Sequence, residues 1–227
     1  MYSIWHTSHC GSTYLACLLS ESIPTYSEPT WCKEDKIIEK PNCLVKYPSY
    51  EGYKVIKHGG KKVFLYRTLY SDLLKNAIKP SGIGHSVYEN FFNHPFKPAL
   101  LEKYDKAVRN CTGLLHQTTT RAYIWLNYVK YMNEAKDIIF VNSQDLFNDP
   151  NNVCRRICAF FEIEYVPVQA NYYNLNSTLN NCDDIIDLNK LDKSKVFVEP
   201  YDVHNAKLIR WVNDFLGESP RIKDMAY

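Results

Sequence analysis

A glycine followed by two hydroxyl residues stands between an apolar run and the start of a predicted helix. Gly11, Ser12 and Thr13 come after the apolar residues 2–5 and lead into the apolar residues 16–19. Gly11 lets the backbone bend close to a ligand, and the two hydroxyl groups can donate hydrogen bonds to it. Because the first turn of a helix presents free amide groups and a partial positive charge, this strand-turn-helix segment predicts a site for phosphate or sulfate.

Two familiar phosphate loops do not match this segment. The nucleotide-binding pattern G-x-x-x-x-G-K-[ST] needs a second glycine and a lysine directly before the hydroxyl residue, and the segment has neither. A cysteine phosphatase would need an arginine six residues after Cys10, where this chain has Ala16. An ordinary turn, in which Ser and Thr begin a helix, remains an open interpretation.

Residues 8–15, Ser-His-Cys-Gly-Ser-Thr-Tyr-Leu, resemble the 5'-phosphosulfate loop of sulfotransferases, whose pattern is roughly P-[KR]-[ST]-G-[ST]-[ST]-x-L. Four further segments resemble features of that family in the family's order, and the similarity covers residues 1–165. The segments at 27–29 and 46–48 are similar to those of the bacterial and tyrosylprotein-type members. The four segments are Ser-Glu-Pro at 27–29, Lys-x-Pro at 46–48, a hydrophobic strand ending in arginine at 63–67, and a late strand with its Asp-Pro stretch at 138–150.

The resemblance implies a sulfuryl donor, 3'-phosphoadenosine 5'-phosphosulfate, and a set of residues that bind it. Arg67 would bind the 3'-phosphate at the end of its strand, helped by Lys75. With a shift of one residue, Asn76 would take the place of Lys75, and both alternatives remain open. The phosphosulfate would be held by residues of the loop, namely His9, Cys10, Gly11, Ser12 and Thr13.

Sulfuryl transfer requires positioning of donor and acceptor, stabilisation of charge on the leaving oxygen and removal of a proton from the attacking group. By the resemblance, Lys46 would approach the transferring group, His9 would contact the leaving side and Glu28 would be the base. His58 is the rival base, because cytosolic sulfotransferases of small molecules use a histidine. It lies in Lys-His-Gly-Gly, which indicates a turn, so we favour Glu28, which follows a strand at the edge where open α/β sheets bind ligands.

The chain departs from the family pattern at several of these positions. His9 replaces a lysine or arginine, and imidazole is mostly neutral at pH 7 unless an anion favours its charged form, so donor binding is expected to be weaker or pH-dependent. After Arg67 the family has a proline and then a serine, where this chain has Leu69 and Lys75. A lysine can still pair with a phosphate, as a point charge without directional geometry.

Composition narrows the classes of partner. The 227 residues carry a net charge of +2, with 27 basic residues interspersed among 25 acidic ones, so nucleic acid is not an expected partner. No apolar run reaches the roughly 18 residues needed to span a membrane, and no signal peptide precedes the first strand, which favours the cytoplasm. The acceptor is expected to be a small molecule, a glycan or a peptide, and the oligomeric state is left open.

Eight cysteines and seven histidines show no metal-binding spacing. The cysteines include no C-x-x-C pair, and the histidines include no H-x-x-x-H or H-E-x-x-H. We therefore expect reduced, mostly buried thiols and no metal.

Alternation of strands and helices predicts an α/β fold, as one domain over residues 1–227. We expect a central parallel sheet of about five strands flanked by helices, and the resemblance implies a P-loop-like sulfotransferase architecture. The predicted strands cover residues 2–6, 23–27, 43–46, 62–66 and 138–142, and the predicted helices cover 12–21, 71–78, 116–135, 150–162 and 202–216.

Two segments stand outside this alternation. Residues 79–98 predict an aromatic-rich insertion, which would lie near the acceptor pocket of a sulfotransferase or simply pack over the core. Residues 165–200 predict a polar surface excursion before the terminal helix at 202–216.

The resemblance thus implies a sulfotransferase that moves a sulfuryl group to a hydroxyl or amine. Two alternatives stay open. One is a non-catalytic descendant of the fold that binds a glycan, lipid head group or protein. The other is a different phosphate-handling enzyme, such as a nucleotide kinase, which would call for the lysine that the loop lacks.

Overall fold

A computed structural model describes residues 1–7, 10–27, 42–47, 55, 58–68, 125, 129, 131–167, 172–177 and 184–187. The chain divides into two compact units, the first made of Met1–Arg67 and Glu134–Val196 and the second of Thr68–Asn133 and Phe197–Tyr227. All strands that the structure describes belong to the first unit. The single domain predicted over residues 1–227 stays a prediction.

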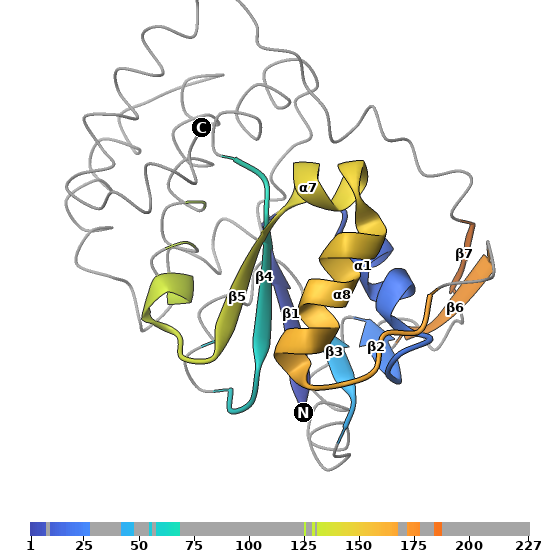
Figure 1. Ribbon diagram of the computed structural model, residues 1–227, viewed down its shortest axis with the longest axis horizontal. Coiled ribbons are helices and arrows are strands. Elements are labelled where there is room, and N and C mark those ends of the chain that lie inside the picture. The colour runs from blue at the N-terminus through green and yellow to red at the C-terminus, as the bar shows by residue number, and fades with distance from the viewer. Residues whose placement is uncertain are drawn as a thin grey trace, which may run out of the picture. The chain divides into compact units, whose positions relative to one another are not determined.

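Five parallel strands form the centre of the first unit (Figure 1). Their order in the sheet is β5-β4-β1-β3-β2, and each pair of neighbours runs parallel. The strands are short apolar runs, as expected for a sheet that is covered on both faces. The predicted α/β fold with a central parallel sheet is therefore confirmed. The strands are β1 (Tyr2–His6), β2 (Thr25–Ser27), β3 (Leu44–Lys46), β4 (Lys62–Tyr66) and β5 (Ile138–Asn142).

Two further strands extend the sheet beyond β2. The strand β6 (Tyr172–Ser177) pairs parallel with β2, and β7 (Asp184–Asp187) pairs antiparallel with β6, so the sheet has seven strands. The segment 165–200, predicted as a polar excursion, thus contains two strands that the sequence did not indicate. Asn and Asp are depleted in strands, which hides this pairing from a reading of composition.

The helices of the first unit begin and end close to their predicted positions. The helix α1 (Ser12–Leu19) ends two residues before the predicted position, and α8 (Pro150–Phe161) ends one residue before it. The Asp149 side chain accepts a hydrogen bond from Asn152 N at 3.1 Å, which caps α8. A short helix, α7 (Ser143–Asn148), connects β5 to α8.

The helices α1 and α8 lie together on one face of the sheet (Figure 1). Strand residues alternate between the faces, so Ile4 packs against these helices while Trp5 belongs to the opposite face, where its ring stacks on Tyr47 at 4.4 Å. This packing buries apolar side chains from the strands and from both helices. They include Ile4, Leu15, Leu19, Val63, Leu65, Val153, Ile157 and Phe161.

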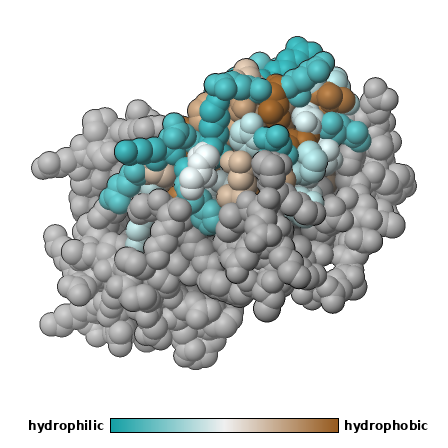
Figure 2. Space-filling view, turned by 90° about the horizontal axis from the view of Figure 1, so that it is seen from below, coloured by the Kyte–Doolittle hydropathy of each residue, from teal (hydrophilic) through white to brown (hydrophobic). Residues whose placement is uncertain are grey.

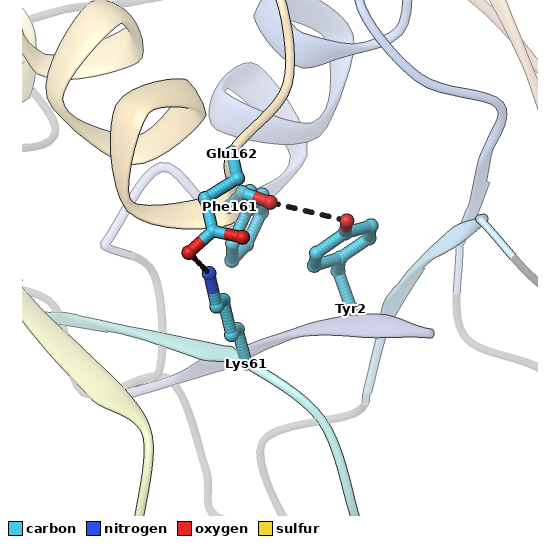
Figure 3. A network of polar contacts seen from close by, with 4 residues as sticks. All are labelled: Tyr2, Lys61, Phe161 and Glu162. Atoms are coloured by element: carbon cyan, nitrogen blue, oxygen red, sulfur yellow. Dashed lines mark hydrogen bonds and ion pairs between the residues drawn. The ribbon is translucent and has the colours of Figure 1, made fainter.

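Polar contacts hold the end of α8 against the amino ends of the strands (Figure 3). The Tyr2 hydroxyl donates to the Phe161 carbonyl at 3.1 Å, and Lys61 pairs with Glu162 at 2.7 Å. Glu162 is 82% exposed, so this ion pair contributes little stability. Figure 2 shows the molecule from below the view of Figure 1, and the described surface there mixes hydrophilic with hydrophobic residues. These contacts lie at the amino edge of the sheet.

Most of the described residues of the second unit are helical. Trp125, Val129 and residues 131–133 lie in a helix, with Trp125, Val129 and Met132 buried, as expected within the helix predicted over 116–135. The helix predicted over 71–78, the insertion at 79–98 and the terminal helix at 202–216 lie outside the described residues. Among the helices that the structure does describe, none has the length and apolar character needed to cross a membrane.

Candidate active site

Gly11 makes the turn between β1 and α1, and the structure gives two reasons for a glycine there. Its φ is 89°, in the left-handed region that side chains disfavour. A Cβ atom at this position would also lie 2.7 Å from the ring atoms Cε2 and Cζ of Phe147, a buried residue of α7. Leu15 N donates to Gly11 O at 3.0 Å and closes the first turn of α1. The main chain at Gly11 is therefore fixed by both conformation and close packing.

Gly11→Ala is expected to lower the free energy of unfolding by about 2 to 4 kcal/mol, because left-handed backbone strain adds to the displacement of the Phe147 ring. Urea unfolding would measure the loss. Gly59→Ala is the matched control, since a Cβ there would meet no atom within 4 Å and its φ is not positive. Equal unfolding midpoints for the two variants would contradict this explanation of Gly11.

Two cationic side chains stand on either side of the strand that leads into this turn. Lys46 is the last residue of β3 and Arg67 follows β4, and these strands are the two neighbours of β1 in the sheet. Parallel strands end at the same edge, so both residues are placed at the carboxyl edge from which the turn emerges. Each residue is only 2% exposed.

Cys10 lies within electrostatic reach of both cations. Burial raises the pKa of its thiol to about 12, and the positive charges of Arg67 and Lys46 only partly oppose this effect. Its Sγ donates to Leu65 O at 3.5 Å. The thiol is therefore neutral near pH 7, so it is a poor nucleophile and does not cancel the two positive charges. Any contact of Cys10 with a bound donor would come from its backbone.

The first turn of α1 adds further hydrogen-bond donors to this positive site. Ser12 is buried and Thr13 is partly exposed, directly after the turn at Gly11. The amide groups of a first helical turn have no partner within the helix, and they carry the positive end of the helix dipole. Gly11, Ser12 and Thr13 are thus brought to the same sheet edge as Lys46 and Arg67, in an arrangement that can bind a phosphate or sulfate ester.

His58, the alternative candidate for the base, packs in an aromatic cluster and is not part of the Gly11 turn. Its ring centroid lies 4.7 Å from that of Tyr47 and 5.4 Å from that of Trp5. His58 Nδ1 lies 3.4 Å from the Tyr47 hydroxyl, and the His58 amide donates to Val55 O at 3.3 Å. The residue therefore combines the expected turn with packing against the sheet.

Three predicted site residues, His9, Glu28 and Lys75, lie outside the described residues, as does Asn76. Their roles stay predictions. Among the residues that the structure does describe, no three His, Cys, Asp or Glu side chains are grouped so that they could hold a metal ion. The five cysteines in those segments, Cys10, Cys17, Cys43, Cys154 and Cys158, are all buried, in agreement with the expectation of mostly buried thiols.

Three residues at this edge were not predicted. Phe147 limits the space at Gly11, while Thr7 and Ser143 bond to the main chain beside Arg67. Thr7 and Ser143 directly follow β1 and β5. Thr7 and Ser143 could have been found as hydroxyl residues at the ends of parallel strands. Nothing in the sequence indicates that Phe147 lies near Gly11.

Comparison with known proteins identifies the fold. No protein-family model and no curated protein matches the sequence. Among solved structures, the mouse sulfotransferase SULT7A1 complexed with PAP aligns with a TM-score of 0.54 at 12% identity, over 99% of this chain and 87% of that one. The sulfotransferase domain from the curacin biosynthetic pathway aligns with a TM-score of 0.50 at 13% identity, over 94% of this chain and 97% of that one. The chain has the α/β fold found in sulfotransferases.

Proposed function

We propose that this protein is a sulfotransferase, which moves a sulfuryl group from 3'-phosphoadenosine 5'-phosphosulfate to a hydroxyl or amine of an acceptor. The observation that carries this proposal is the position of Lys46 and Arg67. Both cations are buried on the two sides of the strand that leads to the Gly11 turn, within electrostatic reach of that turn. Burial keeps the Cys10 thiol neutral near pH 7, so it adds no negative charge beside these two cations.

In this proposal the donor spans the turn and the end of β4. The loop amides, with Ser12 and Thr13, bind the phosphosulfate, and Arg67 binds the 3'-phosphate through charge-assisted hydrogen bonds. His9 and Lys75 complete the donor contacts, as the resemblance implies. The likeness to a sulfotransferase fold solved with PAP, the adenosine 3',5'-bisphosphate product of such a donor, supports this class of ligand.

The chemistry is an in-line transfer. An acceptor oxygen or nitrogen bonds to sulfur while the bond from sulfur to the bridging phosphate oxygen breaks, and the nucleotide leaves with the electron pair. Lys46 approaches the transferring group and offsets the charge that develops there, His9 contacts the leaving oxygen, and Glu28 accepts the proton of the acceptor. Each step requires only groups that this chain or its two substrates supply.

The finer assignments form part of the same proposal. The acceptor is a small molecule, a glycan or a peptide, and the protein acts in the cytoplasm. The segments at 27–29 and 46–48 favour the bacterial and tyrosylprotein-like branch of sulfotransferases.

Arg67→Ala tests the donor site. Loss of a charge-assisted contact to the 3'-phosphate is worth on the order of 1.5 to 3 kcal/mol, so the affinity for adenosine 3',5'-bisphosphate should fall about tenfold or more. Isothermal titration would measure the affinity, and circular dichroism would verify that the variant folds. Arg155→Ala is the matched control, because this exposed arginine of α8 lies over the Tyr165 ring, 5.8 Å from its centroid.

Equal affinity in the unaltered protein and in folded Arg67→Ala would rule out the assignment of Arg67. A similar loss in Arg155→Ala would show a general effect of charge instead of a contact.

A further inference from the structure

The peptide group that joins Tyr66 to Arg67 is held from both sides by side-chain hydroxyls. The amide of Arg67 donates to Thr7 Oγ1 at 2.9 Å. The carbonyl of Tyr66, in the same peptide group, accepts a hydrogen bond from Ser143 Oγ at 2.7 Å. Thr7 and Ser143 follow β1 and β5, the two strands that flank β4. We call these two residues the hydroxyl clamp.

The hydroxyl clamp acts where the regular sheet pairing ends. The last partners in the ladders of β4 are His6 with Leu65 and Tyr66 with Asn142. Thr7 N still donates to Leu65 O at 3.1 Å, so Thr7 bonds to β4 through its backbone and to the next residues through its side chain. Beyond Tyr66 the hydroxyl groups replace the backbone partners that a longer strand would have.

The clamp is also buried and connected to the turn. Thr7, Ser143 and Arg67 are all buried, and of the two hydrogen bonds the one between Arg67 N and Thr7 Oγ1 is buried while the one to Tyr66 O is partly buried. Leu65 O accepts hydrogen bonds from Thr7 N at 3.1 Å and from Cys10 Sγ at 3.5 Å, so Thr7 and Cys10 contact the same carbonyl of β4. Thr7 therefore links the main chain of Arg67 to the segment that contains Gly11.

We propose that Thr7 and Ser143 are positioning residues that fix the main chain at Arg67, and so set the distance between the arginine and the Gly11 turn. This inference rests on the proposed function, in which Arg67 and the turn bind two ends of one nucleotide. Small displacements of a binding group weaken its contacts strongly, so the clamp determines donor affinity without touching the donor.

The test compares Thr7→Val, which keeps the shape but removes the hydroxyl, with Thr7→Ser, which retains it. Titration with adenosine 3',5'-bisphosphate should show a loss of affinity of about three- to tenfold for Thr7→Val, and near-native affinity for Thr7→Ser. Ser143→Ala should resemble Thr7→Val. Thr25→Val is the matched control, because this buried threonine donates to Ile23 O at 2.9 Å at the amino end of β2.

A double-mutant cycle with Arg67→Ala separates positioning from direct contact. If Thr7 acts through Arg67, Thr7→Val should change affinity less than twofold in the Arg67→Ala background. Two results would overturn this inference and leave the proposed function intact. One is an equal loss of affinity in both backgrounds, and the other is no loss in either clamp variant while Arg67→Ala weakens binding. If the unaltered protein does not bind adenosine 3',5'-bisphosphate, the proposed function fails and this inference fails with it.

Discussion

Lys46→Met is expected to lower the rate constant of sulfuryl transfer by about 10²- to 10³-fold, the usual cost of removing one preorganised group that stabilises a developing charge. Methionine keeps most of the length of the side chain and suits a buried position, so the variant removes the charge with little change in packing. Single-turnover measurements would follow the transfer step, and titration would follow donor binding. We expect donor affinity to fall less than the rate constant, because the contact strengthens in the transition state.

Lys62→Met is the matched control for this prediction. Lys62 is a second buried lysine of the sheet, 3% exposed, and its Nζ donates to the carbonyls of Gly60 and Lys136 at the amino end of β4. Its loss should lower stability and leave turnover per folded molecule unchanged. If Lys46→Met retained full turnover, or if both variants lost turnover equally, Lys46 would have no role at the transferring group.

Glu28→Gln should reduce turnover by about 10² to 10⁴, the typical loss when a general base is removed. Glutamine retains the size and hydrogen-bonding capacity of the side chain but cannot accept the proton. Donor affinity should barely change, since the base faces the acceptor. Turnover can be followed with an acceptor or through slow hydrolysis of the sulfuryl donor.

His58→Asn is the comparison for Glu28→Gln. Its ring packs on Tyr47 and Trp5, so the substitution should cost stability while turnover per folded molecule stays near the unaltered level. Loss of turnover in His58→Asn together with full activity in Glu28→Gln would place the protein mechanistically with the histidine-using sulfotransferases.

Much of the first unit could be predicted from local pattern. The apolar runs that became β1, β4 and β5 are short and clearly bounded, and their predicted limits match the structure. The strands β6 and β7 could not be predicted in this way, because Tyr-Tyr-Asn-Leu-Asn-Ser and Asp-Ile-Ile-Asp carry weak strand signals. The strand β6 pairs with β2, and β7 pairs with β6, so both depend on the assembled sheet.

Some residues of the candidate site could likewise be predicted from the sequence, and others could not. The turn at Gly11 and the cations Lys46 and Arg67 follow strands that could be recognised, so their meeting at one sheet edge could be predicted. The hydroxyl clamp and the ring of Phe147 depend on β5 and α7, which come much later in the chain. Contacts of this kind arise from tertiary packing, which no local pattern specifies.

Titration of the unaltered protein with adenosine 3',5'-bisphosphate, and separately with ATP and Mg²⁺, tests the central claim most directly. A donor site built on Arg67 and the Gly11 turn predicts tight binding of the bisphosphate and no comparable binding of ATP with Mg²⁺. Preference for ATP with Mg²⁺ would indicate a kinase, and binding of neither would indicate a non-catalytic descendant of the fold. Either of these results would contradict the assignment as a sulfotransferase.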